Sequence, residues 1–474
     1  MVLMAGSTYL SSEVAAIPLL WVLPLALYLV TFILVFETGI VRFQRSLILV
    51  SGGMLALSLA MLVMRRQVQM PGLVISGCLG IVFFGALLCH GCLYALRPPP
   101  ERLTAYFLAI AAGGVVGGVL VAIVAPLAYN RVFELPVSVT LAGVIGLFWA
   151  SKSHLPGGKL VGVFPFASLV VGLFGIYSLA NRPGDCFRDF YGTVRVVHMG
   201  RVVTMNHGNT RHGAARVDRP SEPLTYYHAG TAVGQMIGLL REQKSTLNVG
   251  VVGLGVGSLA NYGRPGDHFV FYEISPVVLE LAGLEGRIFP LLRNCTATVE
   301  VVPGDARLSL DRERQRLKSR KFDLLVIDAF SSDAVPWHLL TLEAFQLYFD
   351  HLKPEGILAL HISTPQPLDR VVCTNARALD VYGMLLLAPA LACPEPDIQP
   401  FLAPSYYALL SRQKDLLNDP RMQPAPVVGF GPRTFRGLTA SSKDVPYLRS
   451  GRPWTDARSS LSDLLFERLG AEQR

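Results

Sequence analysis

The chain has 474 residues, of which 51% are hydrophobic and only 16% are charged. Soluble domains carry about 25% charged residues, so this composition excludes a protein that consists only of ordinary soluble globular domains. The formal net charge of +8 does not indicate nucleic-acid binding, because the basic residues are scattered through loops and form no basic-aromatic array. We therefore expect no nucleic acid partner.

Residues 1–181 are predicted to form a transmembrane helical domain, with the lipid bilayer as its partner. Six apolar runs lie near the roughly 20 residues that span a bilayer, and short basic loops separate them. No Lys or Arg precedes the first run, so we expect no cleaved secretory signal. The predicted spans are 14–36, 47–64, 73–96, 104–129, 135–150 and 160–180, of which the fifth is short.

The predicted spans are nearly free of charged residues, which a transport pathway would need. A transport role is therefore possible but has no support in the sequence. Within the fourth span, four glycines form overlapping small-residue pairs that predict a close helix–helix seam. They are Gly113, Gly114, Gly117 and Gly118.

Seven cysteines are present, without the spacing of a disulfide framework. Cys89 and Cys92 form a C-x-x-C pair inside a predicted span, where small packing residues are the expected explanation. The histidines of the C-terminal half do not repeat at metal-ligand spacing. We therefore expect no metal site.

The C-terminal half has ordinary charge and is predicted to contain two parts. Residues 182–240 form a small β-rich region, with a hairpin of 191–198 and 201–206 around Met199-Gly200 and a helix at 231–240. Residues 241–474 alternate strands and helices, as in a doubly wound α/β domain. The predicted strands are 248–252, 268–273, 298–302, 322–328, 357–362 and 405–410, and the predicted helices are 276–283, 307–316 and 341–352.

A glycine run follows the first of these strands. Gly253, Gly255 and Gly257 allow the backbone to turn tightly and approach a ligand, and Glu273 ends the next strand, where its carboxylate can bind ribose hydroxyls. The spacing G-x-G-x-G differs from the dinucleotide pattern G-x-G-x-x-G. It is commoner in folds that bind S-adenosyl sulfonium compounds, which have no pyrophosphate.

Three carboxylates are predicted at the carboxyl ends of strands: Glu273, Asp305 and Asp328. Ligands of doubly wound sheets bind at this edge. The segment 329–336 after Asp328 is predicted to be a loop that closes over a substrate. Together with the glycine run, the three acids indicate a nucleotide site.

The chain resembles polyamine aminopropyltransferases of the spermidine synthase type over residues 188–364. The matching motifs are Phe190-Tyr191-Gly192, Thr225-Tyr226-Tyr227-His228, the glycine run, Tyr272-Glu273-Ile274, Gly304-Asp305-Ala306-Arg307 and Ile327-Asp328-Ala329-Phe330-Ser331-Ser332-Asp333. With Ile17-Pro18-Leu19-Leu20-Trp21 and Glu134-Leu135-Pro136 in the membrane half, the whole chain resembles the bacterial membrane-fused spermidine synthase-like proteins. The fold that this implies is a class I methyltransferase-like Rossmann domain behind a helical bundle and a small β-domain.

The resemblance implies roles for individual residues. Glu273 would bind the ribose of decarboxylated S-adenosylmethionine, Asp305 the adenine amino group, and Asp328 would deprotonate the attacking amine. Tyr227 and Asp333 would contact the amine substrate. No tightly bound cofactor is expected, since decarboxylated S-adenosylmethionine, or S-adenosylmethionine itself, serves as a co-substrate.

Several acids of the soluble synthases are replaced. Val256 stands in the glycine run where they carry Asp, Ala229 stands after the Tyr-His pair where they carry Glu, and His207 precedes Gly208 where they carry Asp. Each loss weakens the expectation of a dicationic acceptor such as putrescine. Near the C-terminus, Asp456 in Pro453-Trp454-Thr455-Asp456 is a weaker site candidate, because the expected continuation of that motif is absent.

Three functions remain open from the sequence. The favoured one is a membrane-anchored, aminopropyltransferase-like enzyme that assembles as a homodimer, with its catalytic domain on the cytoplasmic side of the bacterial inner membrane, where the co-substrate is made. The positive-inside rule does not fix this orientation, since both sides carry similar positive charge. The alternatives are an S-adenosylmethionine-dependent methyltransferase with another acceptor and a non-catalytic, nucleotide-sensing membrane or transport protein.

Overall fold

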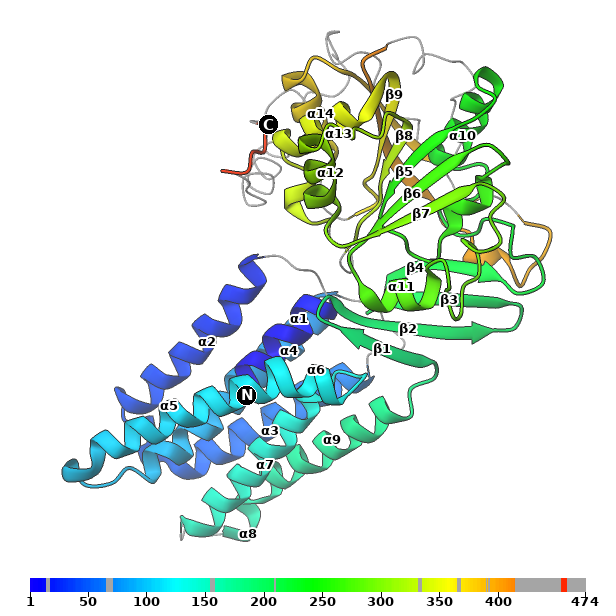
Figure 1. The fold of residues 1–474 in the computed structure, drawn as a ribbon. Helices are drawn as coiled ribbons and strands as arrows, with labels where there is room; N and C mark the ends of the chain where they lie inside the picture. The colour runs from blue at the N-terminus through cyan, green and yellow to red at the C-terminus, as the bar shows by residue number, and fades with distance from the viewer. Residues whose placement is uncertain are drawn as a thin grey trace, which may run out of the picture. The chain divides into compact units, whose positions relative to one another are not determined.

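The computed structural model describes residues 1–13, 18–64, 71–153, 158–208, 210–330, 335–364, 368–388, 390, 393–413 and 453–457. The chain divides into two compact units (Figure 1). One unit comprises Met1–Arg195 with His207–Asn209, and the other comprises Val196–Asn206 with Thr210–Arg474.

The first unit is a bundle of apolar helices with a buried core that includes Leu55, Ile81 and Val139. Glycines bring α7 and α9 together, because a Cβ atom at Gly143 would lie 2.7 Å from the backbone nitrogen of Leu169. The helices are α1 (Val2–Glu13), α2 (Pro18–Phe36), α3 (Gln44–Met64), α4 (Pro71–Ala95), α5 (Leu103–Val119), α6 (Ala125–Ala128), α7 (Glu134–Lys152), α8 (Gly158–Val161) and α9 (Val163–Ala180).

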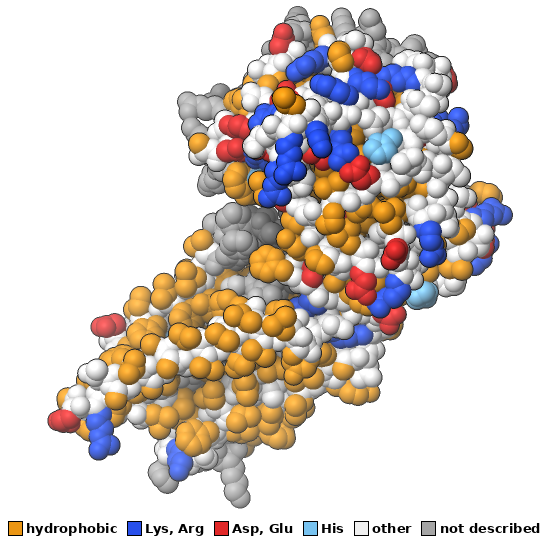
Figure 2. Space-filling view, viewed as in Figure 1, with side chains coloured by type: hydrophobic (Ala, Val, Ile, Leu, Met, Phe, Trp, Pro, Cys, Tyr) orange, Lys and Arg blue, Asp and Glu red, His pale blue; other side chains and the backbone are white. Residues whose placement is uncertain are grey.

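Five helical segments in the described part of the chain are long and apolar enough to cross a membrane. They are Ile40–Val63, Gly72–Ala95, Pro100–Ala128, Glu134–Lys152 and Val163–Ala180, with Val22–Phe36 as a shorter apolar helix in place of the first predicted span. Figure 2 shows hydrophobic side chains covering the visible face of this unit, whereas Lys, Arg, Asp and Glu gather on the other unit. Such an apolar exterior is compatible with a lipid environment.

Of the four glycines in the predicted helix–helix seam of the fourth span, one makes a close contact with another described segment. A Cβ atom at Gly117 would lie 2.9 Å from the backbone nitrogen of Met1, so this glycine does allow a close approach. Gly113, Gly114 and Gly118 have nothing within 4 Å of the equivalent point among the described residues.

The four-stranded sheet has the order β1-β2-β3-β4. Its strands are β1 (Asp185–Asp189), β2 (Gly192–Met199), β3 (Val202–His207) and β4 (Thr210–Arg216). The predicted hairpin is confirmed, and Gly200 turns it with a φ of 58°. The outer strands β1 and β4 were not predicted.

The seven-stranded sheet has the order β10-β11-β9-β8-β5-β6-β7. Strands β5 to β9 run parallel, and β11 is antiparallel to both of its neighbours. Because β6 and β8 flank β5 on opposite sides, the sheet changes winding direction at β5, where doubly wound folds bind ligands. The strands are β5 (Asn248–Val252), β6 (His268–Glu273), β7 (Thr298–Pro303), β8 (Phe322–Ile327), β9 (Leu352–His361), β10 (Tyr382–Ala388) and β11 (Ser405–Ser411).

The helices of this unit begin at side-chain caps. Thr231, Ser275, Asp305 and Thr341 each accept a hydrogen bond from a free backbone N–H of the first turn. The helices are α10 (Ala232–Gln243), α11 (Pro276–Ala282), α12 (Ala306–Gln315), α13 (Leu342–His351) and α14 (Leu368–Ala378), of which α14 was not predicted.

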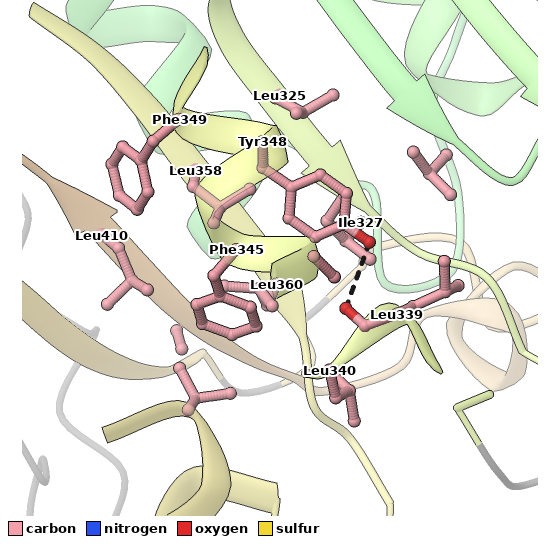
Figure 3. Packing of buried hydrophobic residues seen from close by; sticks show 14 of the residues in the cluster. Leu325, Ile327, Leu339, Leu340, Phe345, Tyr348, Phe349, Leu358, Leu360 and Leu410 are labelled. Carbon is pink, nitrogen blue, oxygen red and sulfur yellow. Dashed lines mark hydrogen bonds between the residues drawn. The ribbon is translucent and has the colours of Figure 1, made fainter. Parts of the chain in front are cut away.

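Helices α12, α13 and α14 contribute to one hydrophobic core against the sheet. Phe345 and Tyr348 of α13 pack among Leu325, Ile327 and Leu360 of the central strands (Figure 3). The buried Tyr348 hydroxyl donates to the carbonyl oxygen of Leu339 at 3.1 Å, so its polar atom is satisfied within the core. This core fixes the strand ends that carry the candidate site.

Candidate functional site

The glycine run forms the loop that follows β5, and this loop lies beside the end of β6. Gly253, Gly255 and Gly257 have φ values of 96°, 54° and 84°, which favour glycine. The Gly253 N–H donates to the carbonyl oxygen of Tyr272 at 2.9 Å. A Cβ atom at Gly253 would lie closer than 3.0 Å to the carbonyl oxygen of Asp328, so glycine alone lets the two strand ends meet.

The loop is followed by a 3₁₀ segment, Ser258–Tyr262, instead of a long helix. A pyrophosphate site normally uses the N-terminus of a full helix. The short segment therefore suits a ligand without a pyrophosphate. Inside the loop, the Val256 side chain is fully buried and packs against the α-carbon of Gly213 on β4.

Glu273 is fixed at the end of β6 by two backbone groups. Its carboxylate accepts hydrogen bonds from the N–H of Leu254, in the glycine loop, at 2.9 Å and from the N–H of Ser275 at 2.8 Å. The side chain is buried, with 8% exposure. A carboxylate held in this way keeps further lone pairs for the hydroxyls of a ligand.

Asp305 follows β7 and caps α12. Its carboxylate accepts from the Leu308 N–H at 2.9 Å and lies 3.1 Å from Nε2 of His338. These contacts, His338 foremost, lower the pKa of Asp305 below its usual value. The Gly304 N–H donates to the Glu273 carbonyl oxygen at 2.8 Å, so Asp305 lies beside the end of β6.

Asp328 directly follows β8 and is also buried, with 8% exposure. One carboxylate oxygen accepts a hydrogen bond from the Tyr227 hydroxyl, and the other lies 2.7 Å from Nδ1 of His361. The Asp328 N–H donates to the Val252 carbonyl oxygen at 2.8 Å, which ties this acid to the start of the glycine loop.

Aromatic rings surround His361 beside Asp328. The His361 ring lies parallel to Tyr407 at 4.6 Å, at 4.6 Å from Tyr226 and at 5.0 Å from Phe330, measured between ring centroids. Burial, followed by the nearby Asp328 charge, raises the pKa values of Tyr226, Tyr227 and Tyr407 well above the usual value. These hydroxyls are therefore donors at neutral pH.

The Tyr407 hydroxyl is buried and has no hydrogen-bond partner among the described residues. A buried hydroxyl without a partner costs free energy, which a ligand that accepts or donates a hydrogen bond would recover. Tyr407 is thus a polar group available to a substrate beside Asp328.

The structure brings most of the predicted site residues together at one edge of the sheet. The three glycines, Glu273, Asp305, Asp328 and Tyr227 are connected by the contacts above. Asp333 lies outside the described residues. Asp456 forms an ion pair with Arg307 at 2.5 Å and accepts from Thr341 at 2.8 Å, which gives it a role in packing the C-terminal segment.

Sequence reasoning missed His361 and Tyr407, and it interpreted His338 as a loop-packing residue. His361 ends β9, and the register that pairs Ile327 with Leu360 places it next to Asp328. His361 is the penultimate residue of the predicted strand 357–362, so the edge rule that selected Asp328 would have selected it if the last two residues of every predicted strand had been considered. Among the described residues, no group of three or more His, Cys, Asp or Glu side chains could hold a metal ion.

The strand order defines a doubly wound α/β domain, and the glycine loop and the acids at the strand ends form its candidate site. No protein-family model matches the chain. A segment of 111 residues is 32% identical to the polyamine aminopropyltransferase of Vibrio vulnificus, covering 23% of this chain and 35% of that protein. The chain thus spans about a third of the length of this curated relative.

Solved structures of low sequence identity resemble the chain. A probable spermidine synthase from Corynebacterium glutamicum has a TM-score of 0.43 and 12% identity, over 59% of this chain and 99% of its own. The spermidine synthase from Thermotoga maritima has a TM-score of 0.34 and 15% identity, over 48% of this chain and 72% of its own.

Proposed function

We propose that this chain is a membrane-anchored, spermidine synthase-like transferase, which moves an aminopropyl group from decarboxylated S-adenosylmethionine to an amine. The observation that carries the proposal is the buried Asp328 carboxylate, held by Tyr227 and His361 at the strand end that touches the glycine loop. The partial identity to a polyamine aminopropyltransferase supports it.

The nucleotide part of the site would bind the sulfonium co-substrate. Glu273, already fixed by two backbone N–H groups, would accept hydrogen bonds from the ribose hydroxyls. Asp305 would accept from the adenine amino group. The loop of Gly253, Gly255 and Gly257 would pass close to the ligand, without the helix N-terminus that a pyrophosphate needs.

The amine part of the site would prepare the nucleophile. An alkylammonium has a pKa near 10, so the acceptor arrives protonated and cannot attack. Asp328 would bind this cation and accept its proton. The freed nitrogen lone pair then forms a bond to the propyl carbon, while the carbon–sulfur electron pair stays on sulfur and leaves as methylthioadenosine. Tyr227 and Asp333 would contact the amine.

The altered acids point to an acceptor other than a simple diamine. The buried Val256 side chain packs against Gly213, so this position of the glycine loop has no room for a second cation-binding group. Ala229 and His207 likewise carry no carboxylate. This same observation favours a second candidate function, methyl transfer from S-adenosylmethionine to another acceptor, since the glycine loop and Glu273 would serve either co-substrate.

The helical unit would anchor the enzyme in the bilayer. Its five long apolar helices are compatible with this role. We place the synthase-like half, comprising the β-rich region 182–240 and the α/β domain 241–474, in the cytoplasm at the bacterial inner membrane. A homodimer of membrane-fused synthase-like chains is the assembly that we propose, with no nucleic acid partner.

The experiment uses the full chain purified in detergent, supplied with decarboxylated S-adenosylmethionine and a panel of mono-, di- and polyamines. We expect methylthioadenosine and an aminopropylated amine, detected by mass spectrometry. Asp328→Asn should reduce the rate at least about 100-fold, the usual contribution of a general base. Asp311→Asn, a change of a half-buried surface carboxylate on α12, is the matched control and should leave the rate unchanged.

A further inference from the structure

The buried imidazole of His361 belongs to a chain of four hydrogen-bonded groups that ends on Asp328. Ser363 Oγ lies 2.7 Å from Nε2 of His361, and Nδ1 lies 2.7 Å from the Asp328 carboxylate. Ser363 Oγ also accepts from the backbone N–H of Tyr406 at 2.8 Å. The chain thus begins at a fixed backbone group on the neighbouring strand.

The donors and acceptors of this chain fix the form of the imidazole. The single hydroxyl proton of Ser363 has two acceptors in reach, Nε2 of His361 at 2.7 Å and the Tyr406 carbonyl oxygen at 3.5 Å. The shorter contact wins, since hydrogen bonds weaken beyond about 3.0 Å. Nε2 is then an acceptor, so the ring proton is on Nδ1 and is donated to Asp328.

The ring of His361 is held on its faces as well as at both nitrogens. It stacks on Tyr407 with an interplanar angle of 15°, and it is 5% exposed. Among the described residues, the titratable groups that face the ring or Asp328 are Tyr226 and Tyr227 from the 224–230 segment and Tyr407 from β11. No rotation of the imidazole is needed to reach Asp328.

We propose that His361 is a positioning residue, which orients the Asp328 carboxylate as a neutral N–H donor. A neutral donor leaves the negative charge of a carboxylate available to a substrate ammonium group. A protonated imidazole would instead compete with the ammonium for the same carboxylate. This inference rests on the proposed function of Asp328 as the amine-binding base.

The test compares two substitutions of His361 in the full chain. His361→Ala removes the donor, and misplacement of a catalytic group by such a change costs about 100-fold in kcat/KM. His361→Asn keeps an amide N–H at the position of Nδ1, so it should recover kcat/KM to within about tenfold of the wild type. The affinity for methylthioadenosine should be unchanged in both variants.

Rescue by the conservative variant separates positioning from a purely structural role. If His361 only fills space, His361→Asn should be as impaired as His361→Ala, because the amide does not fill the volume of the ring. His198→Asn, on the exposed end of β2, is the matched control with a wild-type kcat/KM. A wild-type kcat/KM in His361→Ala, or no recovery in His361→Asn, would overturn the proposal.

A second measurement does not depend on transferase activity. Nitrogen-15 NMR of the histidine-labelled full chain, with the His361 resonance assigned from its loss in His361→Asn, reports which ring nitrogen carries the proton. A proton on Nδ1 supports the proposed chain of hydrogen bonds, and a proton on Nε2 overturns it. If Nδ1 is protonated and no amine yields product, the proposed function fails while the imidazole assignment stands.

Discussion

The α-carbon of Gly253 lies directly against the carbonyl oxygen of Asp328. The two residues directly follow adjacent parallel strands, β5 and β8, and the Asp328 N–H donates to the carbonyl oxygen of Val252, the residue before Gly253. No other residue type fits at this point, because a Cβ atom would come within 3.0 Å of that oxygen. The glycine loop and the candidate base are therefore one structural element.

Gly253→Ala should damage both nucleotide binding and stability. The φ of 96° disfavours alanine by roughly 1–3 kcal/mol, and the contact with Asp328 adds to this cost. Thermal unfolding and methylthioadenosine binding would measure the two effects. Gly200→Ala is the matched control, since Gly200 has a positive φ of 58° but open space around it. Equal effects in both variants would contradict the close approach.

Glu273→Gln should weaken nucleotide binding by about 10- to 100-fold. In the wild type, each carboxylate oxygen accepts one backbone N–H, from Leu254 and from Ser275. A glutamine amide has one oxygen and one NH₂ group, so it can replace one of these two acceptors and not both. Hydrogen bonds to charged groups contribute about 1.5–3 kcal/mol each. Isothermal titration with methylthioadenosine measures the loss. Glu280→Gln, an exposed change on α11, is the control. Unchanged affinity for methylthioadenosine in Glu273→Gln would show that Glu273 does not bind the nucleotide.

Tyr407→Phe should leave stability unchanged or raise it by about 1 kcal/mol, because it removes a buried hydroxyl that has no partner among the described residues. If this hydroxyl contacts the acceptor, KM for the amine should rise several-fold while methylthioadenosine affinity stays constant. Steady-state kinetics against the amine decides the point. An unchanged KM would show that the hydroxyl does not contact the acceptor.

Asp305 should contribute to stability at neutral pH and lose that contribution in acid. Its folded pKa is lowered, chiefly by His338, so the stabilisation is present above the unfolded value of about 3.9. It disappears as the pH falls through the lower folded value. Unfolding free energies measured from pH 6 to pH 2 should therefore fall less steeply in Asp305→Asn. Identical slopes would contradict the pKa shift.

Trp454→Ala should destabilise the α/β unit by about 3–5 kcal/mol, the usual cost of removing a buried Trp. Trp454 is 7% exposed within the main core, and its carbonyl oxygen accepts from the Leu342 N–H at 2.6 Å. Asp456→Asn removes only a partly exposed ion pair and should cost less than about 1 kcal/mol. Chemical denaturation compares the two, and a larger loss in Asp456→Asn would reverse this assignment.

The sequence predicted those parts of the fold that depend on local pattern. The apolar runs that form β5, β6 and β8 and the turn at Gly253 are local features, and the structure confirms them. Helix α14 was missed because polar residues such as Asp369, Arg370 and Asn375, which the structure buries, make the segment polar overall. His361 and Tyr407 were missed for another reason, because the pairing of distant strands brings them to the site. His361 meets Asp328 through the register of β9 on β8, and Tyr407 meets His361 through the register of β11 on β9.

The most direct test of the proposed function is the identity of the thioether that the full chain releases. With decarboxylated S-adenosylmethionine and a reactive amine, aminopropyl transfer predicts methylthioadenosine in equal amount to the aminopropylated amine, measured by mass spectrometry. S-Adenosylhomocysteine formed from S-adenosylmethionine, with no methylthioadenosine from the decarboxylated compound, would contradict aminopropyl transfer and establish methyl transfer instead.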